Sequence, residues 1–284
     1  MSKIISVANQ KGGVGKTTTA INLAACLALS GQKVLIIDID PQGNASSGLG
    51  VNLRESQKGI YELLAGNASL DQVIYPTEID TLKIIPSSVD LAGAEIELVG
   101  RDHREKILSM ALNGVNAEYE FVVIDCPPSL GLLTLNALAV SRSVLIPMQC
   151  EYYALQGLSQ LLKTLKRIQK SINPDLKVEG ILLTMYDART LLNGQVENHV
   201  KKYFSEFLMT TIIPRNIRLS EAPSHGKPIV LYANRSKGSD SYVELAQEVI
   251  QRTKGAIVSP KTELQEITYE EWIKENQLRD FSKK

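Results

Sequence analysis

Short apolar runs alternate with longer amphipathic stretches along most of the chain, and this alternation limits the folds open to it. Helical periodicity predicts helices at residues 16–29, 89–98, 102–112, 131–140, 154–171, 193–205 and 239–254. Between them, runs rich in Val and Ile predict buried strands at residues 3–9, 33–40, 82–86, 120–127, 143–149 and 177–186. Strands and helices that alternate in this way predict an α/β fold, with a mostly parallel twisted sheet flanked by helices on both faces.

The chain of 284 residues is long enough to bury a substantial core. Residues 253–261 (TKGAIVSPK) look like a linker, so we expect one domain over residues 1–254. We then expect a linker and a C-terminal tail of unknown role over residues 255–284. The sequence of the last 24 residues predicts a helix with the apolar residues Ile267, Trp272, Leu278 and Phe281.

The composition indicates an ordinary globular protein, with 44% hydrophobic and 22% charged residues. No apolar run approaches the roughly 20 residues of a membrane span, and the N-terminal apolar segment is too short for a signal peptide. We therefore expect a cytoplasmic protein without a membrane partner. Three widely spaced cysteines in apolar contexts predict buried free thiols: Cys26, Cys126 and Cys150.

The formal net charge of zero hides an asymmetry between the two halves of the chain. Residues 1–159 carry 11 basic and 16 acidic side chains, whereas residues 160–260 carry 15 basic and 9 acidic ones. A basic second half is typical of a protein with an anionic partner such as nucleic acid, but an ordinary lysine-rich surface explains the count equally well.

A glycine-rich segment, QKGGVGKTT, joins the first predicted strand to the first predicted helix. The phosphate-loop pattern G-x-x-x-x-G-K-[ST] fits its second half, with Gly15, Lys16 and Thr17 in place, but Gln10 stands where the first glycine belongs. A helix that starts directly after such a loop points backbone N–H groups at an anion. The alternative, a plain strand-to-helix turn with two solvated lysines, leaves the agreement of strand, glycines, lysine and helix unexplained.

The residue types of this loop predict how a nucleotide would bind. Glycines let the backbone turn tightly and present successive N–H groups to phosphate oxygens. Lys16 would reach the β- and γ-phosphates, and the Thr17 hydroxyl would hold Mg²⁺. The nucleotide-binding residues predicted from the loop are Gly12, Gly13, Val14, Gly15, Lys16, Thr17 and Thr18.

Three aspartates follow two of the predicted strands. Asp38 and Asp40 end the run IIDID, and Asp125 ends the run FVVID. Ligands of open α/β sheets bind at the carboxyl ends of the strands. We expect Asp38 and Asp40, two apart on one strand, to share a face and approach Mg²⁺ or a nucleophilic water, and Asp125 to serve the water shell of the metal. Any one of these aspartates taken alone is better explained as a turn or cap residue.

The segments KGGVGKTT, DIDPQGNASSGLG and VVIDCPPSLGLLTLNAL together resemble the deviant Walker-A ATPases, most closely the ParA/Soj partitioning family. The resemblance covers roughly residues 1–253 and implies a P-loop NTPase-like fold that binds ATP and Mg²⁺. In this family a lysine matching Lys11 crosses a dimer interface to the partner's phosphates, and the first loop glycine is dispensable, which accounts for Gln10. The resemblance further implies that Asp40 supports the hydrolytic water, so Lys11, Lys16 and Asp40 form the expected catalytic set. Asp38 and Asp125 then join Thr17 around Mg²⁺.

The same resemblance assigns residues in the second half of the chain. Pro214 and Asn216 match positions that close over adenine, and Met185 is a weaker candidate; without the resemblance, an ordinary turn explains this segment better. The sequence has no N-K-x-D element for guanine, which favours ATP over GTP. Arg189 and Arg218 match DNA-binding arginines of the chromosomal members. Residues that could widen this patch, although each alone is better explained as ordinary surface, are Lys201, Lys202, Lys227, Arg235 and Lys237.

These features predict an ATP-dependent DNA-partitioning ATPase of the chromosome or plasmid type, associated with the nucleoid. ATP would join two copies, the homodimer would bind duplex DNA nonspecifically, and a ParB/Spo0J-type protein would stimulate slow hydrolysis. The main alternative is a MinD-like membrane-associated cell-division ATPase, which the slightly acidic tail disfavours. An iron–sulfur carrier or nitrogenase-reductase-like protein lacks its paired cysteines here, and the DPQGN segment argues against a dethiobiotin-synthetase relative.

Overall fold

The computed structural model describes residues 2–54, 57–115, 118–151 and 154–255. Seven strands form one sheet in the order β3-β4-β2-β5-β1-β6-β7, and all neighbours are parallel except β3 and β4. In chain order the strands are β1 Lys3–Val7, β2 Val34–Asp38, β3 Tyr75–Pro76, β4 Leu82–Ile85, β5 Phe121–Asp125, β6 Ser143–Gln149 and β7 Lys177–Thr184.

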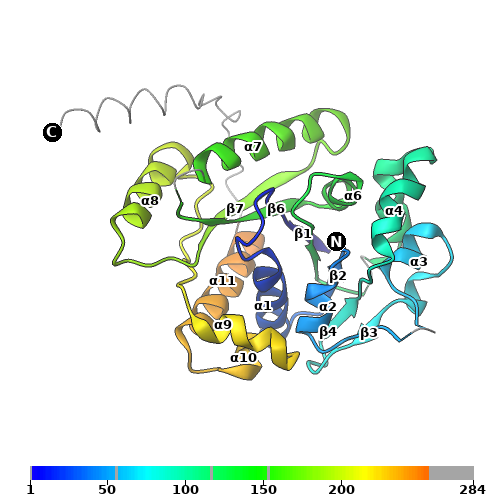
Figure 1. The fold of residues 1–284 in the computed structure, drawn as a ribbon, viewed down its shortest axis with the longest axis horizontal. Helices are drawn as coiled ribbons and strands as arrows, with labels where there is room; N and C mark the ends of the chain where they lie inside the picture. Colours follow the sequence, from blue (N-terminus) through cyan, green and yellow to red (C-terminus); the bar gives the residue numbers. More distant parts are fainter. Residues whose placement is uncertain (1, 55–56, 116–117, 152–153, 256–284) are drawn as a thin grey trace.

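Helices cover both faces of the sheet (Figure 1). One face packs against α1 Lys16–Leu29, α2 Asn44–Gly48, α9 Ile217–Glu221, α10 Ile229–Tyr232 and α11 Lys237–Lys254. The other face packs against α3 Ile60–Ala65, α4 Leu91–Glu97, α5 Ile107–Ala111, α6 Leu132–Val140, α7 Ala154–Ser171 and α8 Leu191–Phe204. Short 3₁₀ turns lie at Leu70–Gln72, Leu98–Gly100, Arg104–Lys106 and Ala222–His225.

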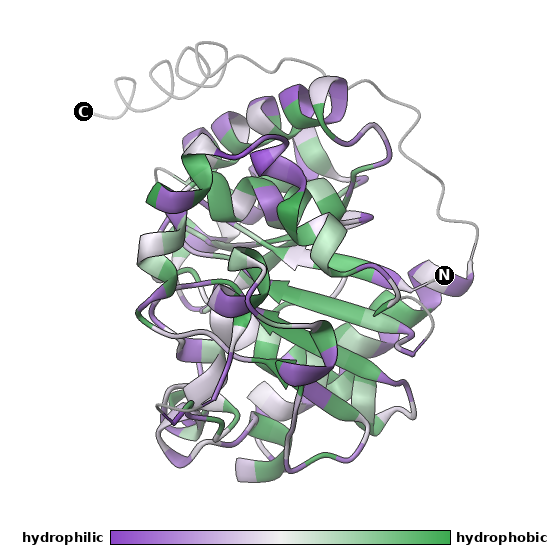
Figure 2. Cartoon of the chain, turned by 90° about the vertical axis from the view of Figure 1, so that its right-hand side faces the viewer, coloured by the Kyte–Doolittle hydropathy of each residue, from purple (hydrophilic) through white to green (hydrophobic). Residues whose placement is uncertain are grey.

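The core consists of two apolar layers, one on each side of the sheet. Successive residues of a strand point to opposite faces, so in β2 Leu35 and Ile37 belong to one layer and Val34 and Ile36 to the other. The central strands β2 and β5 are accordingly apolar up to their last residue, an aspartate in each, and lie between helices whose outward sides are hydrophilic (Figure 2). This is the pattern of a parallel sheet buried on both faces.

The predicted fold class is confirmed, with differences at the ends of elements. Residues 16–29, 143–149 and 154–171 have the predicted bounds, but β1, β2, β5 and β7 end two residues early, where their regular ladder pairing stops and the chain enters the loops of the site. The range 102–112 contains a 3₁₀ turn and α5 rather than one helix. Helix α11 ends at residue 254 as predicted for 239–254, so the linker-like segment 253–261 overlaps its last two residues, and the predicted tail helix lies outside the described residues.

The three cysteines are free and buried, as the sequence predicts. Burial raises the pKa of both Cys26 and Cys150 to about 12, so these thiols are not reactive at neutral pH. Within the described residues, every helix is too short or too polar to cross a membrane.

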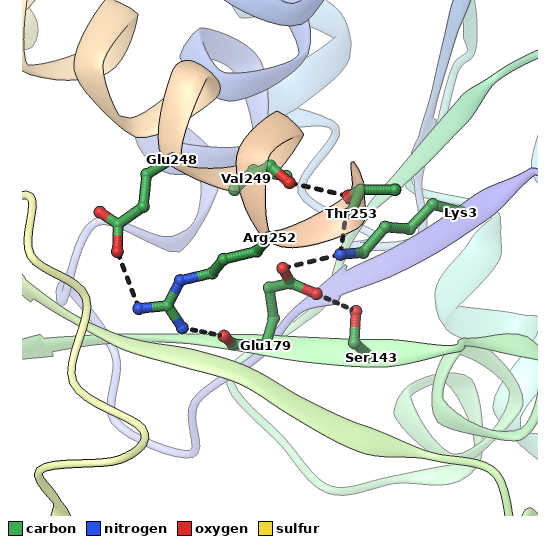
Figure 3. Close-up of polar contacts among 7 residues, drawn as sticks. All are labelled: Lys3, Ser143, Glu179, Glu248, Val249, Arg252 and Thr253. Carbon is green, nitrogen blue, oxygen red and sulfur yellow. Dashed lines mark hydrogen bonds and ion pairs between the residues drawn. The ribbon is translucent and has the colours of Figure 1, made fainter. Parts of the chain in front are cut away.

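A buried ion-pair network ties the last turn of α11 to the strands at the amino-terminal edge of the sheet (Figure 3). The Lys3 ammonium donates to Glu179 Oε1 at 2.8 Å and to Thr253 Oγ1 at 3.0 Å. The Ser143 hydroxyl donates to the other Glu179 oxygen at 2.6 Å, and Arg252 donates to the Glu179 carbonyl at 2.9 Å. The side chains of Lys3 and Glu179 are only 12% and 2% exposed, so their charges depend on each other.

We expect Lys3→Met to lower the free energy of unfolding by about 3 kcal/mol, because it leaves the Glu179 carboxylate buried without its cation, while the Ser143 hydroxyl still donates to it. Urea denaturation followed by circular dichroism measures the loss. The double variant Lys3→Met/Glu179→Leu should recover most of it, since an apolar pair of similar volume removes the unpaired charge. A loss below about 1 kcal/mol for Lys3→Met would show that the network contributes little to stability.

Candidate nucleotide site

The glycine-rich segment forms a tight loop between β1 and α1, at the carboxyl edge of the sheet. Gly13 has φ +74° and Gly15 has φ +85°, in the left-handed region that favours glycine, so a side chain at either position would strain the backbone. Gly15 is the N-cap of α1, and no side chain caps this helix end. The first N–H groups of α1 are therefore available to an anion, as a phosphate loop requires.

Side chains from two other strands fix the shape of this loop. The Thr184 hydroxyl, at the end of β7, donates to the Val14 carbonyl at 2.8 Å, and the Gln149 amide, at the end of β6, donates to the Gly13 carbonyl at 3.2 Å. These contacts hold the loop carbonyls on one side, so its N–H groups are preorganised on the other.

Lys16 is a buried lysine at the base of the loop, with only 7% of its surface exposed. Its ammonium donates to the Lys11 carbonyl at 3.2 Å. Burial lowers the pKa of Lys16, whereas the nearby carboxylates of Asp125 and Asp40 raise it. The carboxylates beside the loop thus favour the charged form of Lys16, and a charged ammonium is suited to bind phosphate oxygens.

The three predicted aspartates lie near one another at the ends of adjacent strands. Asp38 of β2 is directly opposite Asp125 of β5 in the parallel register. Asp40 lies two residues beyond the end of β2, so it belongs to the following turn and does not share a strand face with Asp38 as predicted. The chain turns sharply at this point, since the Asp40 N–H donates to Asp38 Oδ1 at 3.2 Å and the Gln42 N–H donates to Asp40 Oδ1 at 3.0 Å.

Asp38 and Asp125 differ in how their charges are stabilised. Asp38 accepts from the Ser46 N–H at 2.8 Å and the Ser46 hydroxyl at 2.7 Å, but burial still raises its pKa to about 6. Asp125 is fully buried, and neither of its oxygens makes a hydrogen bond of standard geometry to a described residue. Burial and the charge of Asp38 raise the pKa of Asp125 well above its usual value, and the Thr17 hydroxyl lowers it only in part.

These features fit a magnesium ion that phosphates and water hold for the most part. The described residues contain no cluster of three or more side chains that could bind a metal without other ligands. Mg²⁺ at nucleotide sites usually keeps several waters and takes one or two protein oxygens. The unpartnered Asp125 carboxylate and the Thr17 hydroxyl near it are suitable groups for such a shell.

Lys11 lies at the rim of the loop rather than at its base. Its ammonium forms an ion pair with Glu151, and both side chains are well exposed. Glu151 was not predicted, although it follows the end of a predicted strand, the same signal that identified Asp125. Ser46, which contacts Asp38 from the next helix, was not predicted either, nor were Gln149 and Thr184, whose contacts join segments far apart in the sequence.

The segment of the predicted adenine residues runs beside the end of β7. Tyr186 pairs with Pro214 in an isolated parallel bridge, and the Asn216 side chain accepts the Arg218 N–H at 2.9 Å as the N-cap of α9. Met185 has φ +49° and approaches Gly15 of the loop. A pocket of about 300 Å³ opens beside it, lined by Gln149, Cys150, Glu151, Met185, Asp187, Thr190, Asn193 and Arg215.

The structure also shows the surroundings of the basic side chains predicted to bind DNA. Arg189 and Arg218 are exposed on neighbouring segments, and each pairs with a nearby carboxylate, Asp187 or Glu221. Two lysines of the wider predicted patch are paired as well, Lys201 with Glu197 and Lys227 with Glu78, while Lys202 lies over the Tyr203 ring.

Comparisons with known proteins agree with this geometry. Residues 2–178 match the family model described as "AAA domain". Soj, the sporulation initiation inhibitor protein of Bacillus subtilis, is 57% identical over 88% of this chain and 98% of its own length. The chromosome partitioning protein ParA of Myxococcus xanthus is 54% identical over 89% of each chain.

Solved structures show the same fold with nucleotide bound. The structure of cobyrinic acid a,c-diamide synthase from Mycobacterium smegmatis holds an ATP analogue and magnesium. It has a TM-score of 0.81 and 36% sequence identity to this chain, and the match covers 90% of this chain and 97% of that one. A putative plasmid partition protein from Borrelia burgdorferi bound to AMPPNP has a TM-score of 0.74 and 25% identity over 89% of this chain and 99% of its own.

Proposed function

Because this chain belongs to the ParA/Soj family of partitioning ATPases, we propose that it binds ATP with Mg²⁺, dimerises around it and retains DNA until hydrolysis releases it. The observation that carries this proposal is the placement of its two loop lysines. Lys16 is buried among carboxylates at the base of the loop, and Lys11 is exposed at its rim.

Each group of residues in the site has a separate role in ATP binding or hydrolysis. The backbone N–H groups of the loop and the Lys16 ammonium bind the β- and γ-phosphates. Thr17, Asp38 and Asp125 would hold the magnesium together with water, and the ion would offset charge on the phosphates. Asp40 orients the attacking water from its turn beyond β2. Pro214 and Asn216, held beside the end of β7, contact the adenine.

Two copies would meet with their phosphate loops facing each other. The nucleotide phosphates of one copy then compete with Glu151 for the Lys11 ammonium of the other. ATP becomes part of the interface, so binding favours the dimer and loss of the γ-phosphate favours separate chains. Hydrolysis is slow until a ParB/Spo0J-type protein bound at centromere-like sites completes the site. The cycle places the protein on the nucleoid in the cytoplasm.

A gel shift on duplex DNA of unrelated sequence tests this proposal. We expect retention with ATP and little with ADP or without nucleotide, because only the ATP dimer presents two sets of basic side chains to one duplex. Arg189→Ala and Arg218→Ala should each lose most of this retention while keeping ATP-dependent dimerisation. Unchanged DNA binding of both variants at low salt contradicts their assignment.

Two controls accompany this experiment. Arg167→Ala removes an exposed arginine from α7 and should leave DNA retention intact. Vesicles that contain anionic lipid replace DNA in the second control. ATP-dependent vesicle binding without DNA binding would favour the MinD-like alternative over partitioning.

A further inference from the structure

Two segments far apart in sequence lie side by side next to the nucleotide site, and both carry exposed arginines. The Tyr186 N–H donates to the Ile213 carbonyl at 3.0 Å, and the Arg215 N–H donates to the Tyr186 carbonyl at 3.0 Å. These bonds join the loop after β7 to the segment before α9. We call residues 186–190 and 213–221 together the arginine ledge; its arginines are Arg189, Arg215 and Arg218, and its carboxylates are Asp187 and Glu221.

A carboxylate on the ledge binds Arg189 in a two-point contact. Arg189 Nε donates to Asp187 Oδ1 at 2.9 Å, and Nη2 donates to Asp187 Oδ2 at 2.7 Å. The Arg189 backbone N–H also donates to Asp187 Oδ1, at 3.0 Å. These contacts lower the pKa of Asp187 to about 2, and Arg215 adds to the effect, so the carboxylate is charged at every working pH.

Arg218, at the other end of the ledge, is held by a carboxylate through a single contact. Its Nη1 donates to Glu221 Oε2 at 2.8 Å, three residues along the chain. The Tyr232 hydroxyl donates to the same oxygen at 3.1 Å, which fixes the carboxylate from the α10 side. Both contacts lower the pKa of Glu221, so this carboxylate is charged at neutral pH as well.

The arginines lie outside the carboxylates that hold them. The Arg189 side chain is 88% exposed and that of Asp187 only 22%. A guanidinium has five N–H groups, and the Asp187 contact uses two, so three still face solvent. A phosphate can therefore approach the outer edge of the arginine without displacing the carboxylate behind it.

The carboxylates have two opposing effects on such a phosphate. They reduce the freedom of the arginines, which favours binding. They also place two negative charges beside three positive ones, which leaves the ledge with a formal charge of only +1 per chain. Nonspecific DNA binding depends mainly on the number of phosphates neutralised, so the loss of positive charge outweighs the gain in order.

We propose that Asp187 and Glu221 limit the DNA affinity of this surface, so that one chain binds DNA too weakly to be retained and two ATP-joined chains are needed. This inference rests on the proposed partitioning function and adds a regulatory role for the two acidic residues of the ledge. Neutralising both would raise the formal charge of the ledge from +1 to +3 per chain, and from +2 to +6 per dimer.

The double variant Asp187→Asn/Glu221→Gln tests this inference, because the amides keep the size of the side chains and one acceptor oxygen each. We expect DNA binding with ATP about tenfold tighter than that of the natural sequence near physiological salt, measured by fluorescence anisotropy on a labelled duplex. The slope of log K against log salt should steepen by about 0.9 for each additional phosphate neutralised. Without nucleotide, the variant should show measurable DNA binding where the natural protein shows little.

A matched control changes the same two charges at the opposite edge of the sheet. Asp175 and Glu118 are exposed and precede β7 and β5, so Asp175→Asn/Glu118→Gln alters the net charge equally but away from the ledge. This control should bind DNA like the natural protein. An equal gain in the control, or unchanged or weaker binding of the ledge variant, overturns the inference while the partitioning function stands. If the natural protein itself shows no ATP-dependent DNA binding, the proposed function fails, and the inference fails with it.

Discussion

Lys16→Ala should lower the affinity for ATP by at least about 100-fold, or about 2.7 kcal/mol, the largest loss of binding we expect from a single substitution. The Lys16 ammonium is buried at the base of the phosphate loop, and the charge it presents there has no substitute at the base among the described residues. Lys11 is paired with Glu151 at the rim and does not replace it. Titration with a fluorescent ATP analogue measures the change.

This prediction needs a control for folding, because Lys16 also lies beside Asp125 and Asp40. Lys16→Gln keeps a polar side chain in the buried position and should lose ATP affinity to a similar extent, with an unchanged circular dichroism spectrum. Lys11→Ala should bind ATP as a single chain nearly as well as the natural sequence but fail to dimerise. Retained ATP affinity in a folded Lys16→Ala variant would contradict the assignment of the loop.

The sequence predicts the central part of this fold well because its signals are local. Each central strand is mostly a run of β-branched and other apolar residues, α7 has a long periodic pattern, and α1 is an apolar run that directly follows the glycine-rich loop. The phosphate loop is also local, since strand, glycines, lysine and helix are contiguous. The register that places Asp38 opposite Asp125 comes from the structure, although both aspartates end runs of four apolar residues in the sequence.

The elements missed by the sequence analysis are short and depend on distant contacts. Helix α2 has only five residues, too few to be stable alone, so it depends on its packing against α1. A side chain at Gly48 would meet Ile21 of α1, which shows how closely the two helices approach. The two-residue β3 is defined only by its pairing with β4. The position of Asp40 was misjudged because no pattern shows that the ladder ends at Asp38.

Within the site, too, local features were predicted from the sequence and contacts between distant segments were not. Sequence spacing identified the loop and the carboxylates, but it gave no sign that Glu151 pairs with Lys11 or that Thr184 holds the Val14 carbonyl. Both contacts join segments more than 100 residues apart in the chain. The ion pairs of Arg189 and Arg218 are different, because Asp187 and Glu221 lie within three residues of them and a close reading of charge spacing could have found them.

Asp40→Ala should slow ATP hydrolysis by about 100-fold or more without abolishing ATP binding, and should therefore trap the dimer. The Asp40 side chain is buried near Lys16 and Asp125, but its Oδ1 accepts the Gln42 N–H, so it is placed to orient a water rather than to bind the phosphates. A trapped dimer would elute at twice the mass of a single chain in sizing chromatography with ATP and would retain DNA. Phosphate release measures the hydrolysis rate.

The double variant Lys16→Ala/Asp40→Ala separates trapping from nonspecific association, because it should elute as a single chain whether or not ATP is present. Asp71→Ala, which removes an exposed carboxylate from the 3₁₀ turn Leu70–Gln72, should hydrolyse ATP at the natural rate. If Asp40→Ala elutes as a single chain with ATP bound, the nucleotide does not join two copies, and the dimer mechanism is wrong even though the loop binds ATP. If it hydrolyses ATP at the natural rate, another group orients the water, and Asp38, opposite Asp125 at the end of β2, becomes the residue to replace next.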